Sequence, residues 1–196
     1  MTAPREDFWI PSPEEVQDEM QRIRTKGRFN RTLKSTLGTV IVVAAVAVLI
    51  AALFLPVLQV TGTSMEPSFN PGEILITYKT SKFDPGEICA FYYNNKLIIK
   101  RVIAFGGDTV DIREDGVVSV NGKVLDEPYL ESRALGLCDL EFPYTVPLEQ
   151  IFVLGDNRET SVDSRSADFG CIGTEEVLGK VFLRVMPANA IHFYGF

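Results

Sequence analysis

Residues 37–58 read LGTVIVVAAVAVLIAALFLPVL and divide the chain into two parts of different character. They form the centre of a gap of 31 positions, between Lys34 and Glu66, that contains no charged residue. A helix needs about 20 apolar residues to span a bilayer, and a helix of a soluble protein is rarely apolar on every side over this length. We therefore predict one transmembrane anchor helix over residues 35–58.

The residues before this segment predict its orientation. Between Met20 and Lys34 the chain has six basic residues and no acidic one. Basic residues beside a membrane span stay on the cytoplasmic side, so we expect residues 1–34 to form a cytoplasmic tail and everything after Pro56 to lie outside. A cleaved secretory signal is the alternative, but the tail is too long, and the apolar run exceeds the roughly 7–15 residues typical of such signals.

The tail itself has two interpretations. A short polar helix over residues 13–28 would begin at Ser12, whose hydroxyl can cap a helix N-terminus. A solvated and partly disordered arm is the interpretation that we favour, since Pro4, Pro11 and Pro13 break the start of the tail.

The composition excludes several classes of protein. Of 196 residues, 46% are apolar, which is sufficient for one hydrophobic core and excludes a disordered chain. The formal net charge is −7, so we expect no nucleic-acid partner. The chain has three cysteines, Cys89, Cys138 and Cys171, which are too few for a disulfide scaffold. Together with the single histidine, His192, they lack the spacing of a zinc site. We predict no metal and no cofactor, and cysteine pairing is left open.

Beyond the anchor, short apolar runs alternate with turn residues, which is typical of β-strands. We predict strands over residues 74–78, 88–93, 97–105, 109–112, 117–120, 151–154 and 177–185. Asn94-Asn95 and Asn121-Gly122 predict tight hairpin turns. Because strands and helices do not alternate, we expect a mainly β fold built from antiparallel sheets.

The first candidate for chemistry is Ser64, in the loop Thr61-Gly62-Thr63-Ser64-Met65-Glu66-Pro67-Ser68-Phe69 directly after the anchor. Gly62 permits unusual backbone angles and Pro67 restricts the residue before it, so Ser64 lies in a shaped loop. Serine is common in loops, so this segment alone is weak evidence for a nucleophile.

The second candidate is Lys100, inside the predicted strand 97–105. A period of two places it on the same face as Ile98, Val102 and Ala104, among apolar side chains. One interpretation is an edge-strand lysine that reaches water and discourages aggregation. The other is a lysine whose pKa burial lowers until the neutral amine can accept a proton from a serine hydroxyl.

The third candidate is the polar segment LGDNRETSVDSR, residues 154–165, which follows a predicted strand. Taken alone, it is equally well interpreted as a hydrogen-bonded loop that contains an Asp163–Arg165 pair.

Together the three segments resemble the motifs of bacterial type I signal peptidases, which are membrane-bound serine proteases with a Ser-Lys dyad. The motifs are Gly62-x-Ser64-Met65-x-Pro67, Lys100-Arg101-Val102-Ile103 with Gly107-Asp108, and Gly155-Asp156-Asn157-Arg158-x-x-Ser161-x-Asp163-Ser164-Arg165. They occur in the family's order, and the resemblance extends over residues from about 40 to 187. It implies a β catalytic domain over residues 59–196, with a small accessory β subdomain over 109–150, that cleaves signal peptides at the outer face of the bacterial cell membrane.

The resemblance also implies roles for individual residues. By motif position, Ser64 is the nucleophile and Lys100 is the general base, while Ser161 orients the Lys100 amine. An ion-pair network around that amine would be formed by Asp163, Arg165 and Arg101. Because a lysine serves as the base in this family, the remote His192 is not required for catalysis.

The oxyanion hole and the partners follow from the same resemblance. The backbone amide of Ser64 would donate one hydrogen bond to the oxyanion. Gly62 stands where some members carry a serine that donates the second, so the second donor is unassigned. The implied partners are preproteins with signal peptides and the lipid bilayer, and contact with the secretion machinery is left open.

Two other classes of protein share parts of this pattern. Self-cleaving Ser-Lys repressors have a similar catalytic fold, but they are soluble, and the anchor disfavours them. A membrane-tethered binding module without chemistry would lack Ser64 or Lys100, and both residues are present.

Overall fold

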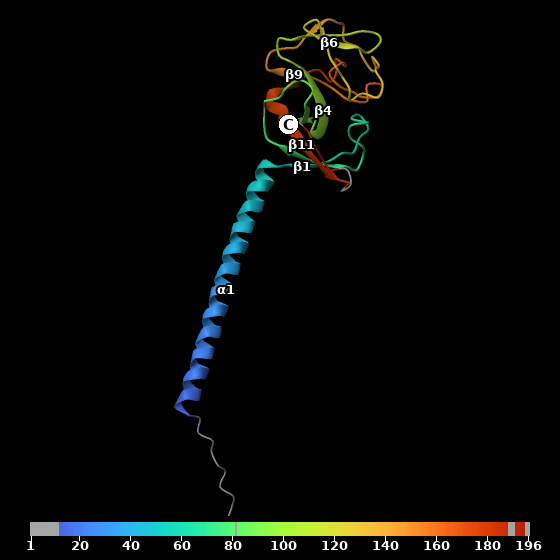
Figure 1. The fold of residues 1–196 in the computed structure, drawn as a ribbon. Coiled ribbons are helices and arrows are strands. Elements are labelled where there is room, and N and C mark those ends of the chain that lie inside the picture. The colour runs from blue at the N-terminus through green and yellow to red at the C-terminus, as the bar shows by residue number, and fades with distance from the viewer. Residues whose placement is uncertain (1–11, 81, 188–190, 195–196) are drawn as a thin grey trace, which may run out of the picture. The chain divides into compact units, whose positions relative to one another are not determined.

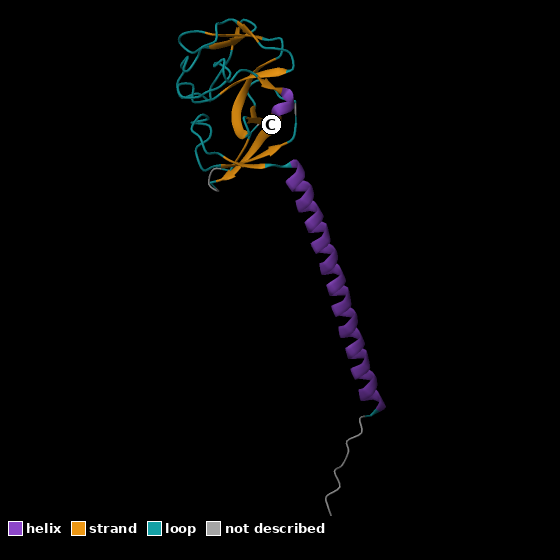
Figure 2. Cartoon of the chain, turned by 180° about the vertical axis from the view of Figure 1, so that it is seen from behind, coloured by secondary structure: helices purple, strands orange, loops and turns teal. Residues whose placement is uncertain are grey.

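The computed structural model describes residues 12–80, 82–187 and 191–194, without the side chains of residues 23–32. The chain divides into two compact units, Met1–Ala51 and Ala52–Phe196. The first unit consists largely of one helix, and the second contains all of the strands described (Figures 1 and 2).

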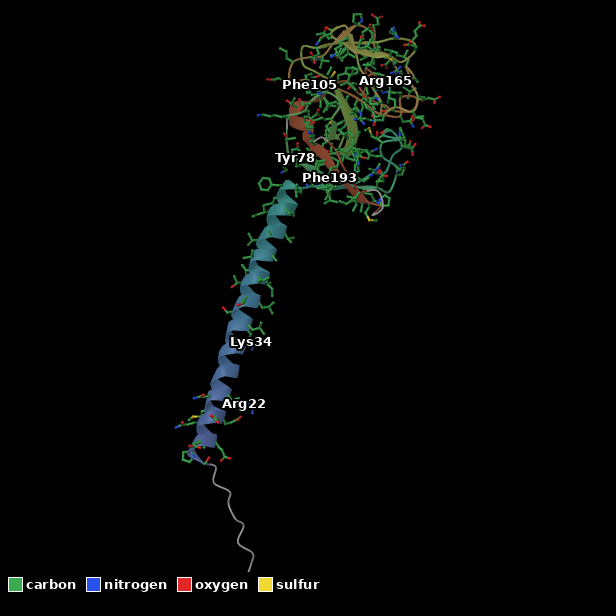
Figure 3. All side chains as sticks on the ribbon, in the orientation of Figure 1. Arg22, Lys34, Tyr78, Phe105, Arg165 and Phe193 are labelled. Carbon is green, nitrogen blue, oxygen red and sulfur yellow. The ribbon has the colours of Figure 1, made fainter. Side chains whose placement is uncertain are left out.

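Helix α1 spans Pro13–Phe54 without interruption. Its start is fixed by a capping box: the Glu15 amide donates to Ser12 Oγ at 3.3 Å, and the Ser12 amide donates to Glu15 Oε2 at 2.8 Å. The favoured interpretation of the tail is therefore wrong for residues 13–34, which are helical and continuous with the apolar segment. Figure 3 shows Arg22 and Lys34 along this helix.

The apolar part of α1 meets the length requirement of a membrane span. Residues Leu33–Phe54 form one helical stretch of 22 residues that is long and apolar enough, and none of it is buried within the protein. The predicted end at residue 58 is wrong, because the helix ends at Phe54. Pro56 cannot continue a helix, and strand β1 (Val57–Gln59) begins directly after it, with Leu58 buried opposite Leu75.

The larger sheet has eight strands in the order β1-β2-β11-β3-β4-β9-β10, with β12 paired to β11. All of its pairings are antiparallel. After β1, its strands are β2 (Ile74–Tyr78), β3 (Ile88–Tyr93), β4 (Lys96–Phe105), β9 (Gln150–Leu154), β10 (Ile172–Gly173), β11 (Val177–Met186) and β12 (His192–Phe193); a 3-10 turn, η1 (Thr174–Glu176), precedes β11.

The smaller sheet has four antiparallel strands in the order β7-β6-β5-β8. They are β5 (Thr109–Ile112), β6 (Val118–Val120), β7 (Lys123–Val124) and β8 (Tyr144–Thr145), all within residues 109–150. Figure 1 shows β6 at one end of the β unit and β1 at the other. The predicted fold class, mainly antiparallel β with an N-terminal apolar helix, is confirmed.

Both predicted hairpin turns are present. Asn94, Asn95, Asn121 and Gly122 have positive φ angles of 48°, 59°, 52° and 78°. Tight two-residue hairpins need this conformation, and asparagine and glycine adopt it most readily. The turns fix the registers of β3 with β4 and of β6 with β7.

The two sheets share a hydrophobic core. Ile103 of β4 and Phe152 and Leu154 of β9 pack with Val110 and Val118 of the smaller sheet. The smaller sheet is thereby fixed against the central strands of the larger one, and β4 is the strand that carries Lys100.

Candidate active site

The loop that carries Ser64 is held by its own apolar side chains and by the segment after β9. Met65 and Phe69 are buried in a core cluster, while Ser64 is half-buried. The Ser64 carbonyl accepts a hydrogen bond from the Asn157 amide at 3.1 Å, and Asn157 Nδ2 donates to the Thr63 carbonyl at 3.4 Å. The first and third motif segments therefore fix each other.

Lys100 is buried in the middle of β4, with 2% of its surface exposed. Its Nζ donates a hydrogen bond to Ser161 Oγ at 2.8 Å. Burial lowers the pKa of Lys100 to about 8; the charges of Asp163 and Asp156 oppose this shift, and Arg165 adds to it. An amine with this pKa is neutral in about a tenth of the molecules at pH 7, far more than an ordinary lysine, so it can accept a proton.

The neighbour of Lys100 across the β3–β4 ladder is Cys89, which is fully buried. Burial raises the pKa of the Cys89 thiol to about 12, so the thiol stays neutral and offers the amine no counter-charge. All three cysteines are unpaired. Ile98 and Val102 pack with Cys89, on the side of β4 predicted for Lys100. Ala104 was predicted on the same side, but it packs with Ile103, because the register shifts between Val102 and Ala104.

Ser64 and Lys100 line the same cleft, which has a volume of about 690 Å³. One wall is residues 59–62 with Ser64 and Met65, and the other is residues 96–100 of β4. Val162 and Phe169 complete the lining together with Tyr93 and Asn94. The cleft thus offers an apolar surface beside a hydroxyl and a neutralisable amine.

Ser161 reaches Lys100 because Gly155 leaves room for it. A Cβ atom at Gly155 would lie 2.1 Å from Ser161 Oγ and 2.5 Å from the Ser64 carbonyl oxygen. Any side chain at position 155 would therefore displace both the Ser161 hydroxyl and the Ser64 loop.

Asp163 and Arg165 form a buried pair that shapes the same loop. Arg165 Nε donates to Asp163 Oδ1 and Arg165 Nη2 to Oδ2, both at 2.8 Å. Asp163 Oδ2 also accepts the Gly155 amide at 2.9 Å, which closes the loop. Figure 3 shows Arg165 toward the end of the β unit that carries the smaller sheet, where Arg165 Nη1 donates to the Leu135 carbonyl at 2.6 Å.

Arg101 belongs to a different pair. Its Nε donates to Asp156 Oδ1 at 2.8 Å and its Nη2 to Oδ2 at 2.6 Å. The predicted single network is therefore two separate bidentate pairs, Arg101–Asp156 and Asp163–Arg165. The reason is the alternation of β4, which places Arg101 and Lys100 on opposite faces.

The single histidine lies elsewhere. His192 is on β12, where it lies opposite Arg184 of β11 in the strand register. Its ring contacts the ring of Tyr194. It is not among the described residues that line the cleft. Within the part of the chain that the structure describes, no group of three or more His, Cys, Asp or Glu side chains is placed to hold a metal ion.

Sequence reasoning missed three contributors to this site. Asp156 is within a quoted motif, but its partner Arg101 could not be assigned from spacing. Glu127 and Tyr129 lie outside all three motifs, yet Glu127 pairs with Arg158 and the Tyr129 ring lies 3.7 Å from Arg101 Cζ. Asp126-Glu127-Pro128-Tyr129 carries no pattern that distinguishes it from a surface turn.

The chain resembles known proteins over most of its length. Residues 33–186 match the family model described as signal peptidase, peptidase S26. Signal peptidase I of Bacillus licheniformis is 36% identical over 165 residues, and the match covers 78% of this chain and 88% of the relative. Signal peptidase IB of Staphylococcus aureus (strain MRSA252) is 35% identical over 154 residues, and the match covers 68% of this chain and 79% of the relative. A crystal structure of a signal peptidase I from Enterococcus faecalis V583 is 32% identical, covers 50% of this chain and 96% of that chain, and has a TM-score of 0.41.

The chain therefore belongs to the signal peptidase family, peptidase S26, whose members are serine peptidases. Its activity is that of signal peptidase I, the enzyme that cleaves signal peptides from secreted preproteins, so its substrates are preproteins that carry a signal peptide.

Proposed function

We propose that cleavage proceeds through acyl transfer, with Ser64 as the nucleophile and Lys100 as the general base. The observation that carries this proposal is the burial of Lys100 in the cleft that Ser64 also lines, which lowers the pKa of the amine to about 8. A base with a pKa near the working pH combines a useful neutral fraction with sufficient basicity.

The proposed steps follow from the two side chains. Neutral Lys100 accepts the Ser64 proton as Ser64 Oγ attacks the scissile carbonyl carbon, and the resulting ammonium protonates the departing amine of the mature protein. This leaves the signal peptide esterified to Ser64. Lys100, neutral again, then removes a proton from a water molecule that attacks the ester and restores the Ser64 hydroxyl.

The Ser64 backbone amide is the proposed donor to the oxyanion. Among the described residues it donates to no other protein group, so it is available to an oxygen in the cleft. Gly62 has no side chain to contribute, and the second donor would be another backbone amide or water.

Ser161 is proposed to orient the base. When Lys100 is neutral, one N–H donates to Ser161 Oγ and the lone pair is left for the Ser64 proton. The segments that position this amine are proposed to be held by two ion pairs, Asp163–Arg165 and Arg101–Asp156.

Substrate selection is proposed to come from the apolar lining of the cleft. Val60, Ile98 and Val162 line it with Ser64 and Lys100. The resemblance to type I signal peptidases implies that shallow apolar pockets here accept small side chains at the first and third positions before the cut. An extended peptide between residues 59–62 and β4 would gain main-chain hydrogen bonds in the manner of an added strand.

The apolar part of α1 is proposed to anchor the enzyme in the bacterial cell membrane as a single span. The six basic residues from Met20 to Lys34 favour a cytoplasmic N-terminus, which leaves residues 59–196 outside. Tethering raises the local concentration of a membrane-held signal peptide at the cleft. The bilayer is thus a proposed partner, and so is the secretion machinery that delivers the preprotein.

The proposal is tested by incubating a preprotein with the wild-type enzyme and with the Ser64→Ala variant in detergent. The wild type is expected to release the mature protein with one new N-terminus, and Ser64→Ala is expected to release none. Turnover by Ser64→Ala near the wild-type rate would remove Ser64 from the mechanism.

A further inference from the structure

Three arginines of the motif segments are held by one segment that lies outside every motif, residues 125–143 between β7 and β8. The Tyr129 ring covers Arg101, with 3.7 Å between the ring centroid and Cζ. Glu127 pairs with Arg158, and the Leu135 carbonyl accepts from Arg165 Nη1. This segment therefore contacts both the strand and the loop that carry the proposed base and its partner.

The Glu127–Arg158 contact is the most deeply buried part of this arrangement. Each side chain has 1% of its surface exposed. Arg158 Nη2 lies 2.5 Å from Glu127 Oε1 and Nη1 lies 3.4 Å from Oε2. Tyr129 Oη donates to Glu127 Oε1 at 2.9 Å, which further fixes the carboxylate. Two buried charges of this kind need each other, because removing one leaves the other unpaired away from water.

Arg158 in turn fixes the loop around Ser161. Its Nε donates to the Gly155 carbonyl at 3.1 Å, and its own carbonyl accepts from Arg165 Nη1 at 2.9 Å. Gly155 is packed so closely against Ser161 that a Cβ there would lie 2.1 Å from Ser161 Oγ. A displacement of Arg158 is therefore transmitted to the hydroxyl that bonds Lys100.

We propose that Glu127 is a positioning residue: through Arg158 it holds the loop 155–165 where Ser161 Oγ accepts the hydrogen bond from Lys100 Nζ. The inference rests on the Ser-Lys mechanism proposed above. Glu127 and Arg158 do not line the cleft, so they act on the orientation of the base and not on substrate contacts. The smaller sheet and its connecting segment thereby take part in catalysis without touching substrate.

The test compares kcat and KM for preprotein cleavage in two variants of the full chain. Glu127→Gln removes the carboxylate charge, and the paired variant Glu127→Met with Arg158→Met removes both buried charges, which often preserves stability. We expect kcat to fall about tenfold or more, because small displacements of a catalytic group have effects of up to about a hundredfold, while KM changes less than about twofold. The rate of each variant is normalised to its folded fraction, which is measured by near-UV circular dichroism.

Asp115→Asn is the matched control. Asp115 pairs with Arg113 beside the same small sheet, but both side chains are exposed, and neither contacts the motif segments. We expect this variant to keep the wild-type kcat. A fall equal to that of Glu127→Gln would show that any lost carboxylate in this region has the same effect, and would overturn the inference.

The route through Ser161 is tested by repeating the paired substitution in the Ser161→Ala background. If Glu127 acts through Ser161, the further loss of kcat in that background is less than about twofold. An equal loss in both backgrounds, or a folded paired variant with wild-type kcat, overturns the inference. Lys100→Met is assayed in parallel: if it stays active, the Ser-Lys mechanism itself fails, whereas an inactive Lys100→Met beside a fully active paired variant refutes only the role of Glu127.

Discussion

Lys100 Nζ donates a 2.8 Å hydrogen bond to Ser161 Oγ, which joins the centre of β4 to a loop 61 positions further along the chain. The bond supplies the buried amine with a polar partner that carries no charge. A carboxylate in the same place would stabilise the ammonium and hold the pKa high. An uncharged hydroxyl can orient the amine without raising its pKa, which is the combination that the proposed lysine base needs.

Ser161→Ala is therefore expected to lower kcat by about 10- to 100-fold. As Lys100 accepts the Ser64 proton, its bond to Ser161 becomes one from a charged donor, which is worth about 1.5–3 kcal/mol, and each 1.36 kcal/mol is a factor of ten in rate. Single-turnover cleavage of a preprotein measures the loss. Asp115→Asn, at an exposed site away from the cleft, is the control. A Ser161→Ala enzyme with the wild-type rate would show that the bond has no catalytic role.

Ser64→Ala is expected to leave the fold unchanged, since Ser64 is half-buried in a loop that is fixed by its backbone carbonyl and by Met65 and Phe69. The free energy of unfolding in urea should stay within about 0.5 kcal/mol of the wild type. A loss above about 2 kcal/mol would instead indicate a structural role for the hydroxyl.

Lys100→Met is expected to be inactive and more stable than the wild type at neutral pH. The folded protein lowers the pKa of Lys100 from 10.5 to about 8, so below pH 8 the charged side chain is disfavoured in the folded state by about 3 kcal/mol, taking 1.36 kcal/mol per unit. As pH rises from about 8 to 10.5, the folded state holds a neutral amine while the unfolded state still binds the proton, and the penalty disappears. Urea titrations at pH 7 and above pH 10.5 measure the difference, and a Lys100→Met variant that is equally destabilised at both pH values would contradict a desolvated amine.

Protease protection tests the proposed topology. Protease added to intact cells is expected to degrade the part after Pro56 and to spare residues 1–34, because the basic residues before the apolar segment favour a cytoplasmic N-terminus. Antibodies against each part follow the fragments, and lysed cells provide the control for access. Loss of the first 34 residues with protection of the remainder would refute the orientation.

Much of the fold was predictable from local pattern. Strands β2, β3 and β5 have the predicted bounds, since short apolar runs between turn residues define strands of four to six residues. The two-residue strands β7, β8, β10 and β12 are too short to show a period, and they exist because a neighbouring strand pairs with them. Pro56 indicates the end of α1 at Phe54, because proline cannot continue a helix. The start at Pro13 depends on the hydrogen bonds between Ser12 and Glu15, which the sequence permits but does not require.

The site was predictable only where a motif carried it. Ser64, Lys100 and Ser161 were each named from motif position, and the structure places the first two in one cleft and bonds the second to the third. The partner of each arginine depends on distances across the fold. The sequence therefore did not show that Arg101 pairs with Asp156, apart from the pair Asp163–Arg165. Glu127 gave no local signal at all, because its partner is 31 positions away.

The pH dependence of cleavage by the wild type and by Lys100→Arg is the most direct test of a neutral lysine base. The wild-type kcat is expected to rise with pH through a midpoint near 8, as Lys100 loses its proton. Lys100→Arg is expected to be inactive across the same range, because a guanidinium keeps its proton at every accessible pH. An active Lys100→Arg enzyme would contradict the account.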